Sequence, residues 1–164
     1  MSYDLYLLRV TPGADAAEIY RQCLEGQEEE LNPGPAVAEV EREKQRLAKL
    51  LMQFDGSLQM AEFDFEGLAR IENIAPDEVR RCYRHLELNS DDYTGIQIAL
   101  WDDHAEVTFP YWHSGEQSEN VLKKVWDHLE VLEVQGGFVT FDPQLGRVLD
   151  LGCDFERVLA FTNL

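Results

Sequence analysis

Basic residues are scarce in this sequence. Its 164 residues include 14 Lys and Arg against 32 Asp and Glu, which gives a formal net charge of −18. No Lys or Arg occurs from His85 through Leu122. A charge of this sign and size repels the phosphates of nucleic acids and anionic membrane surfaces, and it attracts basic proteins. We therefore expect no nucleic-acid or membrane partner.

Cysteines and long apolar runs are also few. Cys23, Cys82 and Cys153 are widely separated, and their spacing matches neither a metal site nor a disulfide framework. No stretch approaches the roughly 18 apolar residues of a transmembrane helix, and the N-terminus lacks the basic region of a signal peptide. These absences predict reduced thiols and a cytoplasmic location.

Motifs for catalysis or cofactor binding are missing as well. The histidines and cysteines occur in no nucleophile frame such as Gly-x-Ser-x-Gly, and Gly136-Gly137 precedes an expected strand rather than the helix of a phosphate loop. Residues 102–104, His113 and Glu116 could gather around a metal, but their spacing fits no known ligand pattern. We predict no catalytic residues, no cofactor and no metal. An enzyme of unknown chemistry stays an alternative, because catalytic groups can meet in space without a sequence motif.

Apolar residues, in contrast, are plentiful. They make up 45% of the chain, enough to offset the entropy lost on folding, and no low-complexity linker interrupts it. We predict a single α+β domain over residues 1–164, with a mainly antiparallel sheet built from an N-terminal strand and two hairpins and packed by several helices. Its helical subregion covers about residues 14–85, and a hairpin-helix-hairpin subregion covers about 86–151.

The first half of the chain alternates strong helix and turn signals. A largely buried strand is expected over residues 3–10, and Asp15 with Glu18 has the spacing of a helix cap. The Asn32-Pro33-Gly34-Pro35 segment is a helix breaker. After it, apolar residues recur at helical spacing from Val37 to Phe54.

The second half predicts two hairpins around a long helix. Apolar residues alternate over 96–100 and 107–109, with a turn at 102–104. Ser114 is a candidate cap for a helix that buries Trp126 and Leu129 and ends at residues 136–137. Residues 138–141 and 147–151 form the second hairpin, and a short amphipathic segment follows.

Residues 68–85 have the pattern of a helix-turn-helix. Asn73 occupies the turn, and Arg80, Arg81 and Arg84 would lie on the second helix. Because phosphate contacts supply much of the affinity for DNA, the net charge of −18 opposes this interpretation. We read the segment as two helices packed on the sheet, with a DNA-binding regulator as an alternative.

Acidic and aromatic residues gather in the segment that lacks Lys and Arg. Large aromatics beside carboxylates are typical of protein interfaces. The same residues could instead serve solubility, with Tyr111 and Trp112 covering the sheet edge. The predicted binding residues are Asp91, Asp92, Asp102, Asp103, Glu106, Tyr111, Trp112 and Glu116.

Several short strings in this region resemble a known group of proteins. They are Gly95-Ile96-Gln97-Ile98, Phe109-Pro110-Tyr111-Trp112 and Phe141-Asp142-Pro143-Gln144, which flank the expected long helix. Over residues 86–151 the chain resembles small acidic α+β proteins of bacteria, including immunity proteins that neutralise secreted polymorphic toxins. The resemblance implies a non-enzymatic inhibitor that binds a basic toxin.

Overall fold

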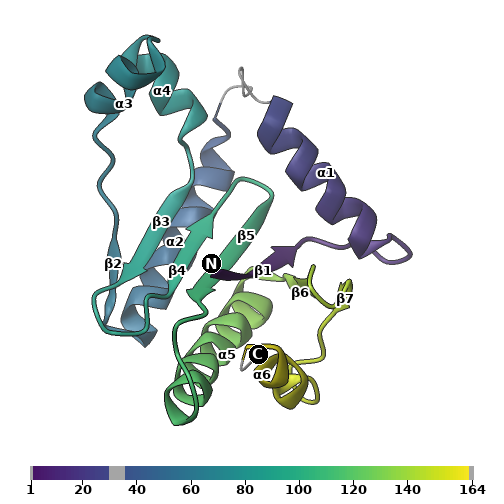
Figure 1. Ribbon diagram of the computed structural model, residues 1–164. Coiled ribbons are helices and arrows are strands. Elements are labelled where there is room, and N and C mark those ends of the chain that lie inside the picture. The colour runs from purple at the N-terminus through teal and green to yellow at the C-terminus, as the bar shows by residue number, and fades with distance from the viewer. Residues whose placement is uncertain (1, 30–35, 163–164) are drawn as a thin grey trace.

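A seven-stranded antiparallel sheet forms the centre of the computed structural model, which describes residues 2–29 and 36–162 (Figure 1). The strand order is β2-β3-β4-β5-β1-β6-β7. The strands are β1 (Ser2–Leu8), β2 (Leu58–Met60), β3 (Leu86–Ser90), β4 (Gln97–Leu100), β5 (His104–Pro110), β6 (Val139–Asp142) and β7 (Arg147–Val148). The N-terminal strand lies between β5 and β6, with both hairpins beside it. The predicted α+β fold is thus confirmed, and β2 and β3 add two strands to the predicted N-terminal strand and two hairpins.

Helices cover both faces of this sheet. The helices of the described residues are α1 (Ala16–Glu29), α2 (Ala38–Phe54), α3 (Phe65–Glu72), α4 (Pro76–Cys82), α5 (Glu116–Gly136) and α6 (Phe155–Thr162), of which α3 and α4 lie apart from both faces. Leu5 and Leu7 of β1 belong to the main core, together with residues of α2 and α5. Leu8 points to the other face, where it packs with Cys23 of α1 in a smaller core. The alternation of side chains along a strand therefore separates the two layers.

The long helix buries the side chains that its periodicity predicts. Leu129 is fully buried, and Trp126 has an exposed fraction of 6%. The indole Nε1 of Trp126 donates a hydrogen bond to the carbonyl of Leu151 over 2.8 Å. The bond ties α5 to the segment that leads into α6.

The predicted helix starts are partly correct. The Asp15 carboxylate accepts a 3.0 Å hydrogen bond from the backbone N–H of Ala17 at the start of α1, and Pro76 is the first residue of α4. The cap expected at Ser114 is wrong, because Gly115 precedes α5 with a left-handed φ of 58° and no side-chain cap. Only glycine adopts that backbone readily. The breaker predicted at residues 32–35 lies outside the described residues.

The helix-turn-helix-like segment forms two helices that do not pack on a sheet face. Figure 1 shows α3 and α4 beyond the end of β3, where they contact each other. Asn73 ends α3 in a left-handed conformation, with φ of 56°. Our prediction that this pair packs on the sheet is corrected, because the two helices contact each other and Ile71 is left 79% exposed.

Candidate functional site

The eight predicted binding residues do not form one surface. Asp91 and Asp92 precede β4, whereas Asp102 and Asp103 follow it in the turn to β5. The four residues of β4 separate these pairs by about 13 Å. The sequence places them in one acidic segment, but the antiparallel hairpin carries them to opposite ends of the sheet.

At the β4–β5 turn, Asp102 is neutralised by two cations. Its Oδ1 lies 2.7 Å from Nζ of Lys44, and its Oδ2 lies 2.5 Å from a guanidinium nitrogen of Arg84. Lys44 is almost entirely buried and also donates to the backbone carbonyl of Arg84. Asp102 therefore joins α2 to the segment between α4 and β3, and this contact is structural.

The neighbouring His104 lies between two carboxylates. Its Nδ1 is 2.7 Å from Oδ1 of Asp103, and its Nε2 is 3.3 Å from Oε1 of Glu106. The imidazole is buried, whereas Asp103 is exposed. Burial alone would lower the pKa of His104, but its hydrogen bonds with Asp103, Cys23 and Glu106 raise it to about 11.

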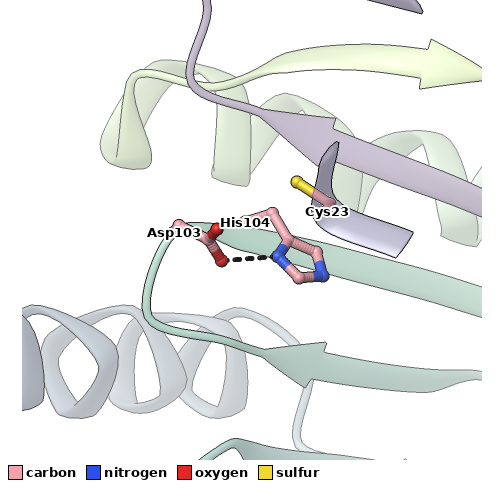
Figure 2. Close-up of side chains that lie close together, drawn as sticks. All are labelled: Cys23, Asp103 and His104. Atoms are coloured by element: carbon pink, nitrogen blue, oxygen red, sulfur yellow. Dashed lines mark hydrogen bonds and ion pairs between the residues drawn. The ribbon is translucent and has the colours of Figure 1, made fainter. Parts of the chain in front are cut away.

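Cys23 completes this cluster from another element. Figure 2 shows its side chain reaching from α1 toward His104 and Asp103. One potential ligand atom from each of the three residues lies within 4.8 Å of the other two. The metal grouping considered from the sequence, which combined residues 102–104 with His113 and Glu116, is not brought together, because the latter two follow β5 at its far end.

A cavity lies beside this cluster. It has a volume of about 470 Å³, is bounded by α2 and the β4–β5 turn, and includes His104 in its wall. Four basic residues also line it, and three of them are held by carboxylates or backbone carbonyls. They are Arg9, Arg42, Lys44 and Arg46. The cavity therefore borders His104 on the side of α2.

At the opposite end of the sheet, Asp92 is held by an internal ion pair. Its Oδ2 lies 2.5 Å from Nζ of Lys124 on α5, and its Oδ1 accepts a hydrogen bond from the backbone N–H of Thr94. Burial opposes ionisation, but the bonds from Lys124 and Thr94 hold the pKa of Asp92 well below its ordinary value of 3.8. Asp91, in contrast, is exposed.

Two large aromatic side chains are exposed at this same end. Trp112 has an exposed fraction of 73% and Tyr93 one of 61%. Their rings lie 5.8 Å and 6.0 Å, respectively, from the ring of His113, which is buried. We call Tyr93, Trp112 and the exposed carboxylates Asp91 and Glu116 the aromatic surface.

Tyr111 does not belong to this surface. It is half-buried, and its ring packs edge-on against Tyr3, with the centroids 5.8 Å apart. The predicted aromatic pair is thus split: Tyr111 packs against the sheet, whereas Trp112 is exposed to solvent. Tyr93, which the sequence analysis missed, was detectable as a large aromatic beside the Asp91-Asp92 pair.

Comparisons of this chain with protein-family models, curated proteins and solved structures find no match. Among the described residues, no helix has both the length and the apolar character that crossing a membrane requires.

Proposed function

We propose that this chain is a non-enzymatic cytoplasmic protein that binds a basic protein partner through the aromatic surface. Of the partners that the resemblance implies, a toxin neutralised by stoichiometric binding fits this role. The observation that carries the proposal is the 73% exposure of Trp112 in a chain of net charge −18.

Exposure of the Trp112 indole favours a binding role because an isolated chain gains nothing from leaving so large an apolar side chain in water. Trp and Tyr dominate the energetic centres of protein interfaces, where burial of their rings supplies much of the affinity. The rings of Tyr93 and Trp112 both lie about 6 Å from the ring of the buried His113, with which each is in contact range. A partner that covers both would remove two large aromatic side chains from solvent.

The charge of the chain supports a basic partner. Asp91 and Glu116, which are close in sequence to Tyr93 and Trp112, are both exposed, and the overall charge of −18 extends the negative field beyond them. Such a field accelerates encounter with a positively charged protein and disfavours nucleic acid. A basic toxin meets both conditions, since its surface would be attracted and then held by the two rings.

Affinity capture with the purified chain tests this proposal. Wild type and Trp112→Ala are immobilised and exposed to lysate of the native host, and bound proteins are identified by mass spectrometry. We expect a basic protein that wild type retains, that Trp112→Ala retains at least tenfold less, and that forms a one-to-one complex when both proteins are purified.

Val134→Ala is the matched control. Val134 is 78% exposed on α5, about 27 Å along the helix from its start. This variant removes an exposed apolar side chain but leaves the aromatic surface intact, so it should bind like wild type. Equal loss of binding in both variants, or no loss in either, contradicts an interface at Trp112. Turnover of the captured protein or a small molecule would contradict the non-enzymatic role.

A further inference from the structure

We propose that Cys23, Asp103 and His104 bind a divalent transition metal ion of the zinc type, in a site separate from the aromatic surface. The three side chains come from α1, the β4–β5 turn and the start of β5, and they lie close together (Figure 2). Thiolate, imidazole and carboxylate are the three ligand types that Zn²⁺ uses in proteins.

The arrangement of the ligand atoms suits a single ion. One potential ligand atom of each residue lies within 4.8 Å of the other two, and ligands about 2.0 to 2.3 Å from one ion are separated by less than this distance. Nδ1 of His104 already faces the Asp103 carboxylate at 2.7 Å. A small outward movement of that carboxylate, which is exposed, would admit the ion between them.

Glu106 supplies the outer support that metal-binding histidines commonly have. Its Oε1 lies 3.3 Å from Nε2 of His104, on the side of the ring away from Asp103. A histidine that ligates through one nitrogen usually donates its other N–H to a carboxylate or carbonyl, which fixes the ring and its tautomer. Nδ1 is thus the ligand atom, and Glu106 holds the imidazole in place.

The site would join two parts of the fold. Cys23 lies on α1, which covers one face of the sheet, whereas Asp103 lies in the β4–β5 turn and His104 is the first residue of β5. A bound ion would fasten α1 to this turn across 80 residues of sequence. Three protein ligands leave a fourth tetrahedral position for water, reached from the exposed side of Asp103.

Metal titration of the full, reduced chain tests the site. The protein is stripped with a chelator and titrated with Zn²⁺ against a chromogenic competitor, and separately with Co²⁺, whose bond to a thiolate gives a near-ultraviolet charge-transfer band. We expect one ion per chain, the thiolate band, and a higher unfolding temperature with metal. Absence of stoichiometric binding or of the band in wild type would overturn the proposal.

Single variants assign the ligands. Cys23→Ser should abolish the cobalt band and weaken zinc binding at least tenfold, and His104→Gln should weaken binding similarly. Cys153→Ser removes an exposed thiol outside the cluster and should change neither readout. Glu106→Gln keeps every ligand and should weaken zinc binding 10- to 100-fold. This variant therefore still tests the site if a ligand variant fails to fold. Unchanged affinity in Glu106→Gln and Cys23→Ser, or loss of the band in Cys153→Ser, refutes the assignment.

Discussion

Nε2 of His128, a fully buried residue on α5, lies 2.9 Å from Oδ2 of Asp55 at the end of α2. Burial lowers the pKa of His128 despite the nearby carboxylate. Within the described residues its Nδ1 has no hydrogen-bond partner, so a second proton on the ring would find no acceptor. Nε2 of the neutral ring therefore donates to Asp55, and Lys124 approaches the same carboxylate at 3.1 Å.

This network predicts loss of stability in acid. The folded pKa of His128 lies below the unfolded value of about 6.5, so the unfolded chain takes up the proton first and stability falls as the pH drops below about 7. The pKa of Asp92 is also depressed, because its bonds with Lys124 and Thr94 outweigh the effect of burial. The stability that ionised Asp92 contributes to the fold is therefore lost as the pH falls through the acidic range. Each proton bound only by the unfolded chain costs about 1.4 kcal/mol per pH unit.

Urea unfolding of wild type and His128→Asn from pH 8 to 5 measures this effect. Protonation of carboxylates also relieves repulsion within a chain of charge −18, and this effect is common to all variants. The decisive quantity is therefore the difference in pH dependence between wild type and His128→Asn. The variant should lose less stability than wild type on acidification. The exposed-site variant Glu130→Gln should follow the wild-type curve. Identical pH dependence in wild type and His128→Asn would show that His128 does not stay neutral in the fold.

Leu129→Ala should destabilise the fold by about 2 to 5 kcal/mol, because it opens a cavity in the main core where Leu129 is fully buried. The measurement is the free energy of unfolding in urea. Trp126→Ala should fall in the same range. Val134→Ala, on the exposed face of the same helix, should change stability by less than about 0.5 kcal/mol. A small effect at Leu129 would mean that α5 turns another face to the sheet.

Gly95→Ala should perturb Trp112. Gly95 has φ of +67°, and an added Cβ would lie 3.1 Å from Cζ2 of Trp112 and from Cγ of Pro110. Gly146 has nearly the same φ, +65°, with no atom within 4 Å of the added Cβ. Both variants should lose about 1 to 2 kcal/mol of stability, because alanine disfavours the left-handed backbone conformation. Gly95→Ala should lose more, because its Cβ would also crowd Trp112 and Pro110.

Thermal unfolding and acrylamide quenching of tryptophan fluorescence distinguish these two effects. Gly146→Ala should leave the quenching of Trp112 unchanged, whereas Gly95→Ala should alter it. Equal destabilisation of both, with unchanged quenching, would show that the Trp112 ring does not rest on this loop.

Once the partner is purified, removing the surface carboxylates and removing the Trp112 ring should affect different rate constants of binding. Asp91→Asn combined with Glu116→Gln should lower the association rate about threefold at low salt, with the difference vanishing at high salt. Trp112→Ala should mainly raise the dissociation rate. Asp127→Asn with Glu130→Gln removes the same charge from exposed positions further along α5 and controls for net charge. Equal slowing by both double variants would assign the attraction to the whole molecule instead of to the aromatic surface.

The sequence by itself determined the elements whose signals are local. The spacing of Trp126 and Leu129 placed the buried side of α5, and the alternation before and after residues 102–104 identified the β4–β5 hairpin. Pro76 and Asp15 marked helix starts because a fixed φ and a carboxylate near free N–H groups act within one turn. Net charge also follows from composition, and with it the expectation of a basic partner.

Only the tertiary structure decided which side chains meet. Sequence proximity put Asp91 and Asp103 in one acidic segment, but the strand between them sends their side chains to opposite ends of the sheet. Cys23 reaches His104 because α1 folds back over the sheet, a contact across 81 residues that no local pattern encodes. Tyr111 and Trp112 are neighbours in sequence, but only Trp112 is exposed. The difference arises because a residue distant in sequence, Tyr3, packs against Tyr111.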